Sequence, residues 1–196
     1  PASMSTATTS ARDAASRRPS ARELVLLALI VAAGVAIRVW GLATQLLGDD
    51  EWHSLHALMA QSYGWIATHF GAADYCIPLT LFEKLCGDTI GISELEPRLV
   101  PLAFGCAALV LLPLLCAERL GWRIALVFAA LLAISPLAIH YARIGRPYSV
   151  SFTCAFAAVL VFERWWRAGG ARWAALFVAC AALATWFHLT SIAFIA

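Results

Sequence analysis

Charged side chains are scarce in this sequence. Lys, Arg, Asp and Glu make up 13% of the 196 residues, and apolar residues make up 62%. In a soluble globular domain about a quarter of the residues are charged. So few charges cannot supply the polar surface of a soluble fold, and the composition therefore predicts a membrane protein.

Several motifs that would indicate a cofactor are also absent. The six cysteines form no CxxC pair and no zinc framework. There is no glycine-rich phosphate loop and no internal repeat. We therefore expect no cofactor and no metal, with a divalent cation possible but unsupported, and no nucleic-acid partner. Cys76 and Cys86 fall in one predicted loop, where a disulfide or two free thiols would both fit their spacing.

Apolar stretches of membrane-spanning length recur along the chain. A helix needs about 20 residues to cross the hydrocarbon core. We predict about five transmembrane helices, at residues 24–43, 99–117, 124–140, 149–162 and 173–196. The predicted fold class is all-α, a polytopic membrane domain over 24–196. Because the sequence stops inside an apolar run, we expect it to be the N-terminal part of a longer chain.

The distribution of charge predicts the orientation. With a cytoplasmic start, nine of the fourteen Lys and Arg fall on the inner side, as the positive-inside rule requires. Residues 1–23, rich in Ala, Ser, Thr and Arg, are then a disordered cytoplasmic N-terminus. Eight of the twelve acids lie in the loop 44–98, which is predicted to face outward.

Two interfacial helices are predicted in this outer loop. Apolar residues recur every three or four positions from Trp52 to Phe70, which is typical of an amphipathic helix lying on a membrane surface. Gly71 would end that helix. Pro78 is allowed in the first turn of a second helix over 79–86.

The outer loop begins with three carboxylates in a row, Asp49, Asp50 and Glu51. They suit the N-terminus of a helix, where acids stabilise the free amides. They also lie at headgroup depth, where a lipid-phosphate substrate would present its reacting carbon. On a helix Asp50 and Glu51 point about 100° apart, so they could perform different tasks. Both interpretations remain open at this stage.

Basic residues on the outer side are candidates for binding an anion. Arg98 enters the second span, and Arg143 and Arg146 lie in the next outer loop. A guanidinium matches phosphate oxygens in bidentate geometry, although an arginine can also snorkel at the interface. Lys84 is a further candidate, with a solvated lysine as the alternative.

Histidines give weaker signals. His188 lies deep in the fifth predicted span, where an ionisable side chain faces a cavity or bonds to a neighbour such as Thr185. His53 and His56 could hold a metal with Glu51, an alternative that the pattern supports poorly.

Five short motifs follow one another along the chain: Leu47-Gly48-Asp49-Asp50-Glu51-Trp52, Ile77-Pro78-Leu79, Glu96-Pro97-Arg98-Leu99, Ser135-Pro136 with Tyr141-Ala142-Arg143 and Arg146-Pro147-Tyr148, and Trp186-Phe187-His188-Leu189-Thr190-Ser191. Together they resemble the bacterial lipid-linked-sugar glycosyltransferases of the GT-C superfamily, related to protein O-mannosyltransferases and to the aminoarabinose transferase of lipid A. The resemblance runs from about residue 24 to the end.

The resemblance implies more spans than are present here and a polyprenyl-phosphate sugar as donor. By analogy, the family's acidic pair falls on Asp50 and Glu51, with Asp50 as the catalytic base and Asp49 as a rival register. The family's arginine at the second span falls on Arg98 and would steady the lipid phosphate. Ile144 stands where the family usually has an acid, which puts a carboxylate role for that loop in doubt.

The resulting hypothesis is an inverting glycosyltransferase in a bacterial inner membrane, with its site on the outer face. Asp50, Asp49 and Glu51 are its predicted catalytic residues. Arg98, Arg143, Arg146, Tyr148, His188 and Lys84 are its predicted substrate-binding residues. The acceptor would be a glycan, lipid or protein hydroxyl, and membrane lipids would surround it. A transporter or flippase of lipid-linked sugars is the main alternative, and a structural subunit of a membrane complex is the third.

Overall fold

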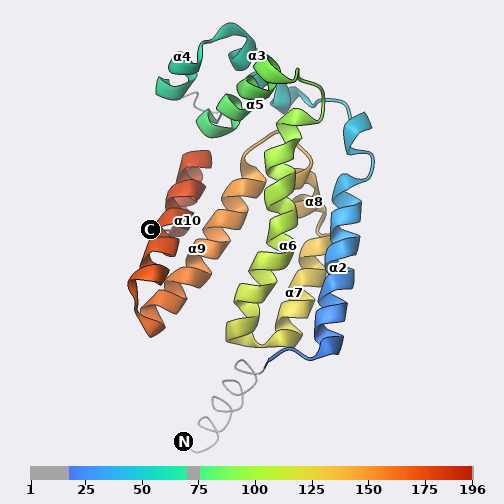
Figure 1. Ribbon diagram of the computed structural model, residues 1–196, viewed down its shortest axis with the longest axis vertical. Helices are drawn as coiled ribbons and strands as arrows, with labels where there is room; N and C mark the ends of the chain where they lie inside the picture. Colours follow the sequence, from blue (N-terminus) through green and yellow to red (C-terminus); the bar gives the residue numbers. More distant parts are fainter. Residues whose placement is uncertain (1–17, 70–75, 196) are drawn as a thin grey trace, which may run out of the picture.

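The computed structural model describes residues 18–69 and 76–195, and within these ranges the chain is helical without strands. Five helices, α2, α6, α7, α9 and α10, run along the long axis and form a bundle (Figure 1). Three shorter helices, α3, α4 and α5, cover one end of the bundle, and we call them the helical cap. The predicted all-α class is confirmed. Most of the predicted N-terminal segment 1–23 lies outside the described residues.

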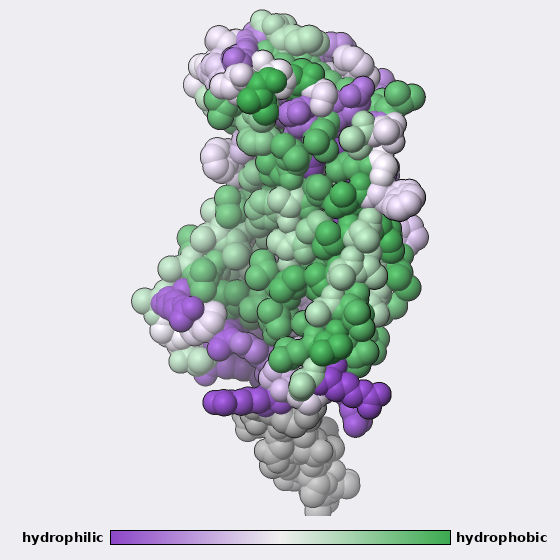
Figure 2. Space-filling view, turned by 45° about the vertical axis from the view of Figure 1, so that its right-hand side comes forward, coloured by the Kyte–Doolittle hydropathy of each residue, from purple (hydrophilic) through white to green (hydrophobic). Residues whose placement is uncertain are grey.

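Among the described residues, two helices are long and apolar enough to cross a membrane. They are Ala21–Thr44, which joins α2 (Ala21–Val39) to η1 (Leu42–Thr44), and Glu96–Leu120, which joins η2 (Glu96–Arg98) to α6 (Leu99–Leu120). Figure 2 shows a broad apolar band between two hydrophilic ends. This distribution is consistent with a membrane protein.

The third predicted span, 124–140, is broken. It consists of α7 (Trp122–Ile134) and α8 (Pro136–Ala142), which meet at an angle of 63°. Ser135 is extended and its hydroxyl accepts a hydrogen bond from the amide of Ala138. The break forms here because a residue before proline avoids the helical region. Counted as one bent span, the pair raises the number of candidate spans to three.

The prediction of five spans is therefore wrong for the described residues, where two or at most three helices qualify. α9 (Tyr148–Ala168) replaces the fourth predicted span, and Ser149, Ser151 and Thr153 in its first turns lower its hydropathy. α10 (Ala171–Phe187) replaces the fifth and is only 17 residues long. His188 is extended and ends it, and only η3 (Leu189–Ser191) and the four-residue α11 (Ile192–Ile195) follow.

Close helix packing organises the bundle around α6. This helix contacts α7 and α9, while α2 packs on α7 and α10 on α9. Leu109 and Leu112 of α6 are fully buried against Leu132 and Ala133 of α7. Gly105 of α6 lies against Ala142 of α8 so closely that a Cβ at position 105 would overlap the Ala142 side chain. The absence of a side chain at Gly105 thus sets how near α8 comes to α6.

Ion pairs join α6 and α9 at the end of the bundle opposite the cap. Arg119 pairs with Glu163, and Arg164 pairs with Glu118. The guanidinium of Arg164 also lies 4.0 Å from the centre of the Trp173 ring. These contacts join the C-terminal ends of α6 and α9 and the start of α10 to one another.

The cap differs in one respect from the two predicted loop helices. The first is divided into α3 (Asp49–Ala60) and α4 (Tyr63–Thr68), because Ser62 starts a new helix by accepting a hydrogen bond from the amide of Trp65 at 3.2 Å. The second, α5 (Ile77–Thr89), has Pro78 in its first turn as expected. α5 packs against both α3 and α4. Residues 70–75, which include the predicted end at Gly71, lie outside the described residues.

Candidate functional site

A buried ion pair joins the cap to the start of α6. Arg98 and Glu51 are 0% and 1% exposed, and two hydrogen bonds connect them, Nε to Oε1 at 2.9 Å and Nη2 to Oε2 at 2.8 Å. The other N–H groups of Arg98 donate to the carbonyls of Leu42, Gln45 and Leu46. A guanidinium has five N–H donors, and here the protein itself accepts all five.

The carboxylate of Glu51 is equally well satisfied. Beyond Arg98, it accepts hydrogen bonds from the amides of Gly48 at 2.8 Å and Gly145 at 2.6 Å. Burial by itself would raise the pKa of Glu51. The hydrogen bonds from Arg98, Gly48 and Gly145 and the charge of Arg98 outweigh it and hold the pKa below its ordinary value. Glu51 therefore stays ionised and ties together α3, the start of α6 and the loop between α8 and α9.

Asp50 has the opposite environment. Its side chain is 55% exposed, and its Oδ2 lies 3.2 Å from Nε of Arg146, which is itself nearly buried. Asp49 is exposed at the first position of α3. Of the three adjacent acids, only Glu51 is buried. Asp50 has an exposed carboxylate that lies beside a positive charge.

The other predicted basic residues hold helix ends. Arg143 donates to the carbonyls of Ile37 and Trp40, at the end of α2, and to the side chain of Gln45. Lys84 donates to the carbonyl of Leu58 in the last turn of α3 and lies 3.8 Å from Asp88. Cations at these positions stabilise the partial negative charge of a helix C-terminus.

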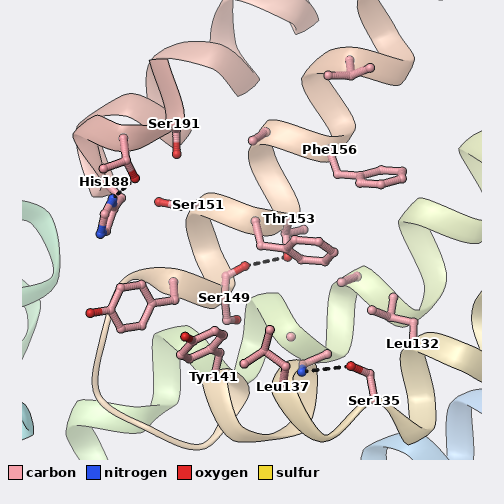
Figure 3. A pocket seen from close by; sticks show the side chains of 18 of the residues that line it. Leu132, Ser135, Leu137, Tyr141, Ser149, Ser151, Thr153, Phe156, His188 and Ser191 are labelled. Atoms are coloured by element: carbon pink, nitrogen blue, oxygen red, sulfur yellow. Dashed lines mark hydrogen bonds between the residues drawn. The ribbon is translucent and has the colours of Figure 1, made fainter. Parts of the chain in front are cut away.

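A cavity of about 470 Å³ lies between α8, α9 and the end of α10, and neither Asp50 nor Arg146 lines it. Tyr148 and His188 both line it, and the guanidinium of Arg146 lies 5.9 Å from the centre of the Tyr148 ring. The rings of Tyr141, Tyr148 and His188 form a row, with centres 4.8 and 5.4 Å apart. Figure 3 shows α8, α9 and the end of α10 contributing the walls. The structure thus brings Asp50, Arg146, Tyr148 and His188 into one region.

His188 bonds to a different hydroxyl from the one suggested by sequence. Its Nδ1 is 2.6 Å from Oγ1 of Thr190, which lies two residues further along the chain. The sequence had suggested Thr185 as the partner. The alternative metal site of His53, His56 and Glu51 is not assembled, since no group of three possible ligands occurs in the described part of the chain. Cys76 and Cys86 are free thiols.

Sequence reasoning missed Glu83, the most unusual acid in the cap. It is 0% exposed on α5, and neither carboxylate oxygen has a hydrogen-bond partner among the described residues. Burial raises the pKa of Glu83 to about 8. The nearby Ser54 hydroxyl, which donates to the carbonyl of Glu51, and the charge of Arg146 lower the pKa of Glu83, and the charge of Glu51 raises it further. Its spacing from Leu79 and Cys86, four and three positions away, could have indicated this buried face.

No protein-family model matches the chain, and no curated protein or solved structure is significantly similar to it. Its function is therefore argued from the site.

Proposed function

We propose that the protein is an inverting glycosyltransferase that takes a sugar from a polyprenyl-phosphate donor. The supporting observation is the pairing of an exposed carboxylate, Asp50, with a nearly buried guanidinium, Arg146, at 3.2 Å. The Tyr148 ring, which lines a cavity, lies 5.9 Å from that guanidinium. Sugar transfer passes through an oxocarbenium-like state. It needs a base for the acceptor hydroxyl and positive charge for the departing phosphate, and this pair can supply both.

In the proposed step Asp50 accepts the proton of the acceptor hydroxyl as its oxygen bonds to the anomeric carbon. The bond from that carbon to the phosphate oxygen breaks on the opposite face, and the polyprenyl phosphate leaves with the electron pair. For this geometry the Asp50–Arg146 contact opens when the donor binds between the two side chains, and Arg146 then stabilises the charge that develops on the phosphate. The sequence alone assigned this role first to Arg98, but Arg98 has all its donors engaged within the fold.

The surroundings of the pair support this division of labour. Tyr148 and His188 line the cavity next to Arg146, and aromatic rings at such a position can stack against a sugar. Glu51 and Arg98 hold α3 against the start of α6, which fixes the position of Asp50 one residue away. The acceptor is a hydroxyl of a glycan, a lipid or a protein, and the reaction takes place on the outer side of a bacterial inner membrane.

The test is transfer of labelled sugar by the full-length protein in membranes, from a panel of undecaprenyl-phosphate sugars to endogenous acceptors. Asp50→Asn should lower turnover about 10²–10⁴-fold, the usual contribution of a general base. Arg146→Gln should lower it comparably. Asp88→Asn is the matched control, because Asp88 is 53% exposed and also pairs with a cation of the cap; it should leave turnover within twofold.

Asp49→Asn distinguishes the two registers of the acidic motif. Loss of transfer in Asp49→Asn together with full transfer in Asp50→Asn would overturn the assignment of the base. Undiminished transfer in Asp50→Asn and Arg146→Gln together would overturn the proposed mechanism. Asp49 and Asp50 are exposed, so Asp49→Asn and Asp50→Asn should cost at most about 1 kcal/mol of stability. Arg146 is nearly buried, so a thermal unfolding measurement checks that Arg146→Gln is folded before its turnover is compared.

A further inference from the structure

The end of the bundle opposite the cap carries an excess of positive charge. Residues 18–23, 118–123 and 163–172 lie there and hold seven arginines and three glutamates, a net charge of +4, without any lysine. Figure 2 shows hydrophilic residues at this end, directly next to the apolar band. Because a guanidinium binds phosphate oxygens in bidentate geometry and an ammonium does not, an end made of arginine alone suits phosphate.

The acids of this end are already engaged within the protein. The two glutamates at the ends of α6 and α9 pair with arginines of the same helices: Glu118 with Arg164, and Glu163 with Arg119 and Arg167. Glu23 accepts hydrogen bonds from the amide and the hydroxyl of Ser20 at the start of α2.

Three arginines at the starts of helices keep their charge available. Arg22 of α2, Arg123 of α7 and Arg172 of α10 are all exposed. Within 18–69 and 76–195 no carboxylate forms an ion pair with any of them. These side chains can therefore contact an anion outside the protein without breaking an ion pair inside it.

On two of these helices the arginine stands at the head of an exposed apolar face. Leu26 and Leu29 follow Arg22 by four and seven residues and are 41% and 62% exposed. Val127 follows Arg123 by four residues and is 60% exposed. Residues at these spacings share one face of a helix. Each face thus has a cationic group at the bundle end and aliphatic side chains behind it, which matches the layout of a phospholipid.

Tryptophans support the same depth for this end. Trp122 immediately precedes Arg123, and the ring centre of Trp173 lies 5.2 Å from the guanidinium of Arg172. Tryptophan is enriched where the headgroups of a bilayer meet its hydrocarbon.

We propose that this end of the bundle binds phospholipids with an anionic headgroup, with Arg22 and Arg123 contacting the phosphates and the acyl chains lying along the apolar faces of α2 and α7. A zwitterionic headgroup carries no net charge to match the excess positive charge, whereas a phosphatidylglycerol carries one negative charge. A soluble phosphodiester would leave the aliphatic side chains uncovered. The surface lies at the end of the bundle opposite Asp50 and Arg146, so it is independent of the proposed transfer reaction.

The experiment measures lipid binding to the full-length protein by native mass spectrometry from a neutral detergent. Dioleoyl phosphatidylglycerol and dioleoyl phosphatidylcholine compete at equal concentration, so that only the headgroups differ. Phosphatidylglycerol should bind more tightly. Because a basic residue near anionic lipid contributes a factor of about five in affinity, Arg22→Gln and Arg123→Gln should each lower the preference about fivefold, and the double variant about thirtyfold.

Arg167→Gln is the matched control. It removes the same charge from the same end, and Arg167 is 60% exposed, but Arg167 already pairs with Glu163 at 2.6 Å. At an ionic strength of about 0.15 M charges are screened beyond about 8 Å, so this variant should keep the preference within about twofold of the wild type. Unfolding midpoints in the same detergent check that each variant is folded, and the single variants decide the question if the double variant is not.

Four outcomes would contradict the proposal. Equal binding of the two lipids by the wild type would remove the headgroup preference, and a wild-type preference in folded Arg22→Gln and Arg123→Gln would remove these two contacts. A loss in Arg167→Gln as large as in Arg22→Gln would replace the contacts by net charge alone. Displacement of phosphatidylglycerol by an equal concentration of its deacylated headgroup, glycerophosphoglycerol, would assign the surface to a soluble phosphodiester.

Discussion

Asp50 and Glu51 are neighbours in sequence, yet they have opposite physical states. Glu51 accepts four hydrogen bonds in the interior, whereas Asp50 is more than half exposed. Their helical separation of about 100° produces this difference, because one direction points toward Arg98 and the other toward the surface. An acid that must take up and release a proton is better placed at Asp50, since removing one partner of a buried ion pair costs roughly 3–5 kcal/mol.

Glu83 provides a prediction about pH. Its pKa is raised to about 8 in the folded chain, whereas an unperturbed glutamate has a pKa of about 4.3. Between these values the folded state holds the proton and the unfolded state has lost it. The free energy of unfolding should therefore fall by about 1.4 kcal/mol for each pH unit between about 4.3 and 8. Above pH 8 it should change little.

Glu83→Gln keeps the shape and removes this titration. Thermal unfolding followed from pH 5 to pH 8.5 should show a variant similar to the wild type at pH 5 and more stable than it at pH 8. Glu94, which is only partly buried, gives a control, because Glu94→Gln should leave the pH dependence of the wild type intact. Parallel pH profiles for Glu83→Gln and the wild type would contradict the neutral state of Glu83.

At the scale of helices, small residues decide the packing. Gly105→Ala should destabilise the protein by about 1–3 kcal/mol, because the new Cβ would overlap Ala142 of α8 and overpacking of a core has costs of this size. Gly64→Ala in α4 is the matched control, since no atom lies within 4 Å of its added Cβ. Unfolding midpoints measured in one detergent compare the two. A Gly105→Ala variant as stable as Gly64→Ala would mean that α8 can move away from α6 freely.

Sequence patterns predicted some of these elements and not others. Hydropathy found α2 and α6, because each is a continuous apolar run, and Pro78 correctly indicated the first turn of α5. The break at Ser135 was missed, since the apolar residues continue across it. The contact of Arg98 with Glu51 joins residues 47 positions apart. No local pattern carries that information, so Arg98 was expected at a phosphate and not in the interior.

At the scale of the whole molecule, the two polar ends should face opposite sides of a membrane. Leu46, beside the cap, is 83% exposed, and Trp166, at the other end of the bundle, is 77% exposed. We expect a membrane-impermeant maleimide to label Leu46→Cys in intact spheroplasts and Trp166→Cys only after permeabilisation. The unsubstituted chain controls for its own six cysteines, which are buried or partly buried. The reverse pattern would place Asp50 in the cytosol, away from the proposed donor.

The Glu51–Arg98 pair also limits how the molecule can admit a substrate. A hinge motion that lifted α3 from the start of α6 would have to break it, at roughly 3–5 kcal/mol, so the lifted form would make up fewer than about one molecule in a hundred. Substrate entry through such a rarely populated form would be slow. A lipid diffusing in the plane of the bilayer would instead approach Asp50 from its exposed flank, and its arrival would depend on two-dimensional diffusion and not on the opening of the cap.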